Sequence, residues 1–240
     1  MTVVIKDSNG SFREKALGWA GCPIDTAGLE VAHFFGGTLE NSLRNFTHGK
    51  ANSTVIGTPT VKANSVALQG RLNLIQTAMA DTNESTLVVV FKPLEIADAI
   101  IIGNLVSPAN NTTRRLAMAY SAPMTVTGFR TTDQNQSGAT TSTALAVGAP
   151  VCLALRNVMG ATPLVTFNNL TKGEVGTMAN PGPPVLGGAI RIGGAYNVAG
   201  YDGKTEVYAA LGFSRKLTDA ELGTLYAWLK AYCARRAIPI

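Results

Sequence analysis

Short runs of apolar residues, separated by turn-forming residues, make up most of the chain from Leu29 onwards. Runs of this length are typical of β-strands, whereas helices need longer stretches with helical periodicity. The runs that predict strands are residues 31–35, 54–56, 65–68, 72–75, 87–91, 116–120, 151–155, 190–192 and 207–213. Many short strands with frequent turns predict an all-β fold, in which two antiparallel sheets form a sandwich.

The pattern of apolar positions differs between these strands. Residues 87–91 are apolar at every position, which is typical of a central strand covered on both faces. Residues 116–120 alternate, as expected of a strand that buries one face. Alternation in the last strand predicts one shared face for Val207, Ala209, Leu211 and Phe213.

The end of the chain predicts a single helix. Thr218 is followed three residues later by Glu221, which forms a capping box, and apolar residues then recur at three- and four-residue spacing as far as Tyr232. We expect a helix over residues 218–236 that packs on the sandwich. Trp228 lies off the apolar stripe, so it either covers a sheet edge or faces a partner. We favour the edge, because tryptophan fills partly buried positions well.

Three stretches lack strand or helix periodicity. Residues 1–28 are irregular and glycine-rich, and we expect them to precede a compact domain at 29–240 as a docking segment or a structural wrap. Residues 133–149 and 176–188 are predicted to be surface loops. Loops on a rigid sandwich often carry binding residues, although connections without a role have the same composition.

Composition narrows the class of protein. The chain has 240 residues, 46% hydrophobic and 15% charged, which suits one globular domain. The longest uncharged apolar stretch, 99–106, is shorter than the roughly 18 residues of a membrane span, and the N-terminus shows no signal-peptide pattern. The net charge of +5 is spread along the chain and does not favour nucleic acid. Cys22, Cys152 and Cys233 lie far apart, so we expect reduced thiols.

Motifs at both ends of the domain resemble a known superfamily. Residues 28–42, GLEVAHFFGGTLENS, and residues 54–60, TVIGTPT, resemble the opening of laminin-G-like domains. Residues 190–194, IRIGG, residues 201–204, YDGK, and residues 209–222, AALGFSRKLTDAEL, resemble the closing pattern of concanavalin A-like lectin sandwiches. The resemblance covers residues 29–235 and implies a two-sheet jelly roll with one C-terminal helix. Versions without a secretion signal resemble domains of tailed-bacteriophage virions.

Enzymatic chemistry is not expected from these residues. Glucanases of this superfamily resemble one another in a strand that places acidic side chains on one face. The nearest pair here, Glu95 and Asp98, would point to opposite faces of a strand. His33 lies in an apolar run and is predicted to be a core residue, while His48 is predicted to lie in a turn. Neither has a cysteine or carboxylate at metal-ligand spacing.

Two kinds of binding site are candidates. The resemblance implies calcium at a sheet rim, for which Asp202 and Asp81 are the candidates, although both residues also suit plain turns. No other cofactor is expected. Glycan binding needs an aromatic platform beside polar side chains. The best combination is Tyr196 with Asn197 and Tyr201 with Asp202, unless the tyrosines only cover the sandwich edge.

The leading hypothesis is a non-enzymatic structural component of a bacteriophage virion, in a tail fibre, baseplate or capsid decoration. It would be made in the host cytoplasm, contact other virion proteins through residues 1–28, assemble as a homo-oligomer and bind host-surface glycan. A free carbohydrate-binding module is the alternative. A glycoside hydrolase or lyase of the same fold is a third hypothesis.

Overall fold

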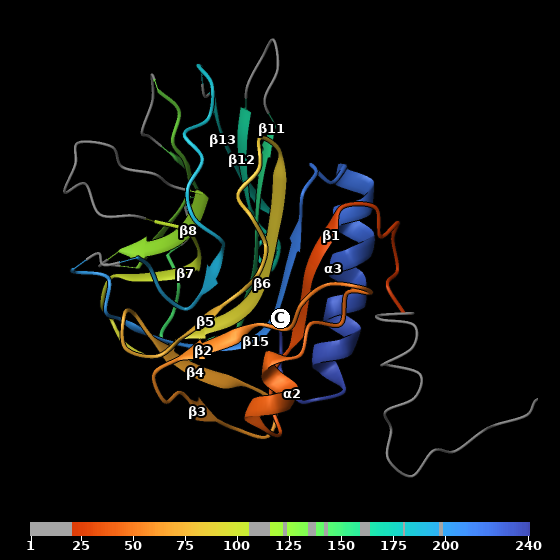
Figure 1. Cartoon of the computed structure of the whole chain (residues 1–240), viewed down its shortest axis with the longest axis vertical. Coiled ribbons are helices and arrows are strands. Elements are labelled where there is room, and N and C mark those ends of the chain that lie inside the picture. The colour runs from red at the N-terminus through yellow and green to blue at the C-terminus, as the bar shows by residue number, and fades with distance from the viewer. Residues whose placement is uncertain are drawn as a thin grey trace, which may run out of the picture.

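The computed structural model describes residues 21–105, 116–121, 124–133, 138–141, 144–158, 164–179, 181–196 and 199–240. Two antiparallel sheets pack face to face, and helix α3 (Asp219–Ala234) lies on the outer face of one of them (Figure 1). This architecture confirms the predicted two-sheet β-sandwich with one helix near the C-terminus. A short helix, α2 (Leu39–Leu43), was not predicted. Among the described helices, none is long and apolar enough to cross a membrane.

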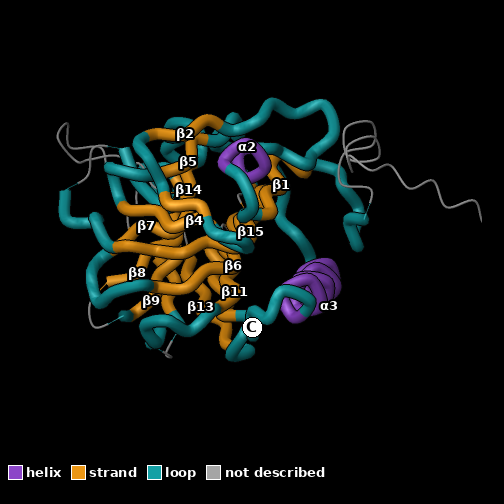
Figure 2. The backbone as a smooth tube through the Cα atoms, turned by 90° about the horizontal axis from the view of Figure 1, so that it is seen from below, coloured by secondary structure: helices purple, strands orange, loops and turns teal. Residues whose placement is uncertain are grey.

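Sheet A has eight strands, seven of them in the order β13-β12-β11-β6-β15-β4-β3, and β1 also pairs with β15. Their bounds are β1 Leu29–Phe34, β3 Thr60–Val61, β4 Val66–Gln69, β6 Ser85–Pro93, β11 Val151–Val158, β12 Leu164–Asn169, β13 Glu174–Ala179 and β15 Lys204–Phe213. Figure 2 shows this sheet between sheet B and α3.

Sheet B has seven strands in the order β10-β9-β8-β7-β14-β5-β2. Their bounds are β2 Thr54–Ile56, β5 Leu74–Gln76, β7 Ala99–Gly103, β8 Leu116–Ser121, β9 Thr125–Arg130, β10 Gly138–Thr140 and β14 Arg191–Ile192.

Strand β6 separates two hydrophobic cores. Leu87, Val89 and Phe91 point into the core between the sheets, whereas Val88 and Val90 face the core beneath α3. The prediction of a central strand covered on both faces is therefore confirmed. Because α3 packs on sheet A, the strands below it are buried on both sides.

The predicted single face of β15 is wrong. A register shift against β6 between Val207 and Ala209 marks a bulge, which changes the alternation of the following residues. Val207 consequently packs between the sheets, while Ala209, Leu211 and Phe213 pack beneath α3. Because β15 has apolar side chains on both faces, the alternation of apolar and polar residues in the sequence does not reveal this bulge.

Strand β8 also departs from its predicted one-sided burial. Ala117 and Ala119, which alternate with the inter-sheet residues, pack on the outer face of sheet B against Ile100, Leu105 and Ala195. Chain segments thus cover this outer face as well. Both positions are alanine, which is too small to show by itself that the face is buried.

Helix α3 begins with the predicted capping box. The backbone N–H of Glu221 donates to Oγ1 of Thr218 (3.2 Å), and the backbone N–H of Thr218 donates to Oε2 of Glu221 (2.8 Å). The helix ends at Ala234, two residues before its predicted end. The Trp228 ring lies 5.5 Å from that of Phe34 on β1, so Trp228 covers the edge of sheet A, as predicted.

Only part of the predicted N-terminal segment lies within the described residues, since 1–20 are outside them. Residues 21–28 are irregular, as predicted, but they pack on the sandwich. The Arg215 guanidinium donates to the backbone carbonyl oxygens of Ala27 (2.7 Å) and Asp25 (3.1 Å), and Ile24 contacts the core beneath α3. The packed domain therefore includes residues before the predicted boundary at 28/29.

Both predicted surface loops contain an edge strand. Strand β10 lies within residues 133–149, part of which is outside the described residues, and most of β13 lies within 176–188. Residues of β13 alternate between partly buried and exposed. An edge strand with so little burial needs few apolar residues, so the apolar pattern did not reveal it. The three cysteines are free thiols, in agreement with the expectation.

Candidate functional site

Residues 193–196 carry Tyr196 past the β4–β5 turn, and residues 199–203 carry Tyr201 and Asp202 past the same turn. A Cβ atom on Gly194 would lie 2.0 Å from the carbonyl oxygen of Gly70, so only glycine allows the two segments to approach this closely. Gly193 has a φ of +78°, which favours glycine for a second reason. The two glycines of the IRIGG motif thus allow residues 193–196 to lie directly against the β4–β5 turn.

Tyr196 lies in a polar cluster on the outer face of sheet B. Its ring is covered by the Arg191 guanidinium, whose carbon lies 3.4 Å from the ring centroid. The Tyr196 hydroxyl lies 2.8 Å from the carbonyl oxygen of Ala189 and 3.1 Å from Oε1 of Gln76, both of which can accept its proton. Arg191 Nε donates to the same Oε1 atom (2.7 Å). We call Arg191, Tyr196 and Gln76 the arginine–tyrosine cluster.

Adjacent strands position the arginine–tyrosine cluster. Arg191 of β14 pairs with Gln76 of β5, and their neighbours Ile192 and Ile75 point into the inter-sheet core. The alternation of a strand therefore directs Arg191 and Gln76 outwards. Arg191 Nη1 donates to the carbonyl oxygen of Ala195 (2.9 Å), whereas its Nη2 has no hydrogen-bond partner among the described residues.

The other predicted glycan-binding residues have separate surroundings. Tyr201 is partly buried against the outer-face core of sheet B. The Asp202 carboxylate accepts two hydrogen bonds from Arg71, at 3.2 and 3.1 Å, and hydrogen bonding to this arginine side chain holds the pKa of Asp202 below its usual value. Asn197 lies outside the described residues. No hydrogen bond or ring contact joins Tyr196 to Tyr201 or Asp202 in the described part of the chain.

Asp81, predicted as a calcium ligand, is fully buried in an ion pair. Its Oδ1 accepts from Nη1 of Arg130 at 2.5 Å, and its Oδ2 accepts from Nδ2 of Asn104 (2.9 Å) and the amide of Gly187 (2.8 Å). Protein donors thus engage both oxygens that a calcium ion would need. Across the described ranges, no group of three or more His, Cys, Asp or Glu could hold a metal. Calcium at Asp202 stays a prediction.

The two histidines lie where the sequence predicts. His33 is buried in β1, its Nε2 lies 2.7 Å from Oγ of Ser53, and its ring stacks on Phe35 at 5.6 Å between centroids. Burial lowers the pKa of His33 to about 4, so the ring is neutral at neutral pH. His48 is exposed in a turn.

The acidic residues considered for catalysis are not on one strand. Glu95 and Asp98 lie in the segment between β6 and β7, and Glu95 accepts a hydrogen bond from the amide of Lys204 (3.0 Å). A further carboxylate, that of Glu206, is buried on sheet A. Burial raises the pKa of Glu206, but Lys62 and neighbouring groups outweigh it and hold this pKa below its usual value.

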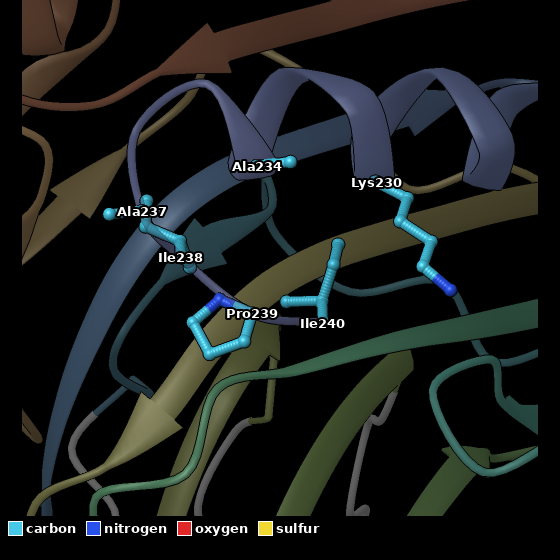
Figure 3. Close-up of a pocket in the computed structure, with 6 residues that line it drawn as sticks. All are labelled: Lys230, Ala234, Ala237, Ile238, Pro239 and Ile240. Carbon is cyan, nitrogen blue, oxygen red and sulfur yellow. The ribbon is translucent and has the colours of Figure 1, made fainter.

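A shallow pocket of about 470 Å³ lies beside the last turn of α3 (Figure 3). Its lining residues are Lys230, Ala234, Ala237, Ile238, Pro239 and Ile240. This lining is apolar apart from one ammonium group. Sugar hydroxyls need several polar partners, so the arginine–tyrosine cluster is the better candidate for glycan.

Sequence reasoning identified Tyr196 and missed Arg191 and Gln76. Arg191 stands between two isoleucines in the IRIGG motif, so alternation alone indicates that it points outwards. Gln76 lies 115 positions earlier in the chain and reaches Arg191 only through the pairing of β5 with β14. No local signal predicts that pairing.

Comparison with known proteins supports the fold. No protein-family model matches the chain, and no curated protein matches it. A Trypanosoma rangeli sialidase in complex with sialic acid matches at 13% identity and a TM-score of 0.59, over 85% of this chain and 33% of that chain. The binding domain of botulinum neurotoxin DC in complex with SialylT matches at 9% identity and a TM-score of 0.59, over 84% of this chain and 52% of that chain.

At such low identity the likeness shows the fold alone, a two-sheet β-sandwich. The chain spans between a third and about half of the length of these two structures. The names of these two structures do not mention a bacteriophage, so the virion role stays a prediction.

Proposed function

We propose that this chain is a non-catalytic module that binds glycan at the arginine–tyrosine cluster. The observation that carries the proposal is the Arg191 guanidinium, stacked on Tyr196 and held by Gln76, with Nη2 unused by the described protein groups. A guanidinium in a fixed orientation presents planar donors to a carboxylate or a sugar hydroxyl. The cluster therefore suits a sugar that bears a carboxylate.

Two further observations support an acidic glycan. The two matching structures are a sialidase in complex with sialic acid and a neurotoxin binding domain in complex with SialylT, and this fold accounts for 33% and 52% of those chains. The net charge of +5 favours encounter with acidic polysaccharide at low salt.

The state of Glu206 argues against this buried carboxylate as the acid of a glycosidase. Retaining and inverting glycosidases need one carboxylic acid with a raised pKa to protonate the leaving group. The buried carboxylate of Glu206 has the opposite shift, because Lys62, Lys92 and Ser65 stabilise its charged form against the effect of burial.

The test is a glycan array probed with the full chain, followed by titration of the best ligand. We expect binding to carboxylate-bearing glycans, and at least tenfold weaker binding for Arg191→Gln. Arg236→Gln is the matched control, since the Arg236 guanidinium is also stacked on a tyrosine ring, that of Tyr232 (3.8 Å), but follows α3, and it should bind as the wild type does. An array without any bound glycan, or equal losses in both variants, contradicts the proposal. Release of sugar from the bound glycan contradicts its non-catalytic part.

The finer proposal is a place in a bacteriophage virion, which the laminin-G-like and lectin-like motifs support. The free carbohydrate-binding module remains the alternative. We expect that deleting residues 1–20 abolishes incorporation into particles, while the sandwich still folds. Incorporation of the truncated chain at the wild-type level contradicts docking through this segment.

A further inference from the structure

Four large apolar side chains lie exposed at one end of the sandwich. Ile56 ends β2, Leu72 lies in the β4–β5 turn, Ile96 follows β6, and Val147 precedes β11. Leu72 and Ile96 are 61% and 68% exposed. We call these four side chains the end patch. Exposed apolar residues are ordinary when scattered, but a group of them needs an explanation.

Contacts between the loops place one half of the end patch together. The amide of Gly148 donates to the carbonyl oxygen of Pro93 at the end of β6 (2.8 Å), which brings the turn that carries Val147 to that strand end. Leu94 follows Pro93, and its amide donates to the carbonyl oxygen of Lys204 (3.0 Å). Ile96 lies two residues after Leu94. The turn that carries Val147 and the segment that carries Ile96 therefore lie at the same end of the sandwich.

Close backbone packing places the other half. A Cβ atom on Gly57 would lie 1.8 Å from the carbonyl oxygen of Leu72, so the residue after Ile56 lies directly against Leu72. The neighbouring Arg71 bonds to Asp202, and Asp202 forms a β-bridge with Ala99 at the start of β7. That bridge joins the Leu72 turn to the segment that carries Ile96.

Two ion pairs lie among these apolar side chains. Arg71 pairs with Asp202 at 3.1 Å and Lys204 with Glu95 at 3.8 Å, and all four side chains are partly exposed. The pairs supply equal numbers of positive and negative charges. Apolar side chains bordered by polar and charged groups are the usual composition of a protein interface.

The balance of charge indicates which partner fits. In a two-fold dimer the same surface faces itself, so it must complement itself. The net charge of +5 opposes contact between two copies through a basic surface, whereas a patch with paired charges avoids that repulsion. Across a two-fold axis, Arg71 and Lys204 can also exchange carboxylate partners with the second copy.

We propose that the end patch is a self-association surface that binds a second copy of this chain. The surface includes none of the residues of the arginine–tyrosine cluster, so self-association and glycan binding can fail independently.

Sedimentation velocity of the full chain over a range of concentrations tests the proposal. We expect the wild type to dimerise, and the double variant Leu72→Asp with Ile96→Asp to associate at least tenfold more weakly. Val175→Asp is the matched control, because Val175 is also 61% exposed but lies on edge strand β13. It should dimerise as the wild type does.

Three outcomes would overturn the proposal. They are a wild type that is monomeric at every concentration, a double variant that dimerises normally, and a control that dissociates as far as the double variant. Far-ultraviolet circular dichroism checks that all three proteins are folded, and the substitutions fall on exposed side chains.

Discussion

At the scale of single residues, the buried pair of Asp81 and Arg130 joins segments that are far apart in the chain. Arg130 belongs to β9, and the same carboxylate also accepts from Asn104 after β7 and from Gly187. Both charged side chains are fully buried. Such a pair adds little stability over an apolar pair, but removing one partner leaves a charge buried without compensation.

We therefore expect Asp81→Ala to lower the free energy of unfolding by about 3–5 kcal/mol, measured by urea denaturation. The exposed pair supplies the control, since Asp202→Ala should cost at most about 1 kcal/mol. A small effect of Asp81→Ala would contradict the structural role. A midpoint that rises with calcium in the wild type but not in Asp81→Ala would restore the calcium hypothesis.

His33 makes stability depend on pH. Its pKa falls from 6.5 to about 4 on folding, so between these values the unfolded chain binds more protons. The contribution of neutral His33 to the free energy of unfolding is fully present above pH 6.5 and is lost as the pH falls towards 4. The loss is about 3 kcal/mol from this group. His33→Gln should remove that slope in urea denaturation across this range, whereas His48→Gln, in an exposed turn, should retain it.

At the scale of elements, α3 depends on its first turn. The Thr218 hydroxyl accepts from the amide of Glu221, which otherwise has no partner within the helix. Thr218→Ala should lower the free energy of unfolding by about 1 kcal/mol. Thr224→Ala is the control, since Thr224 lies exposed within the same helix and alanine has the higher helix propensity there. Equal destabilisation by both changes would argue against the cap.

At the scale of the whole molecule, α3 and sheet A share one core. Leu222, Leu225 and Leu229 of the helix pack with residues of β1, β6, β11 and β15. The core also contains Cys152 and Cys233. Detaching the helix would expose this core, so we expect α3 and the sheets to unfold together.

Thiol labelling tests that expectation. Burial raises the pKa of both Cys152 and Cys233, so each should react only when the protein unfolds globally, and at a common rate. Cys22, which is only partly buried, should react faster and serves as the internal control. Labelling of Cys233 in urea too dilute to unfold the sheets would show that α3 detaches separately.

Local sequence patterns predicted the fold class and many of the elements. Apolar runs located the central strand β6, and the spacing of Thr218 and Glu221 located the start of α3, because both signals lie within a few residues. The two glycines after Ile192 were also recognised in the sequence, as part of the IRIGG motif. Such patterns report the local preference of the backbone for strand or helix, and in these elements that preference agrees with the structure of the folded chain.

Contacts between residues far apart in the chain could be seen only in the folded structure. The bulge in β15, the Asp81–Arg130 pair, the contact of Arg191 with Gln76 and the four members of the end patch all depend on strand pairing and loop packing. Such contacts join positions tens to more than a hundred residues apart, and no pattern along the chain specifies their register. The candidate binding surfaces therefore emerge from pairing between strands, whereas the strands themselves follow from the alternation of side chains.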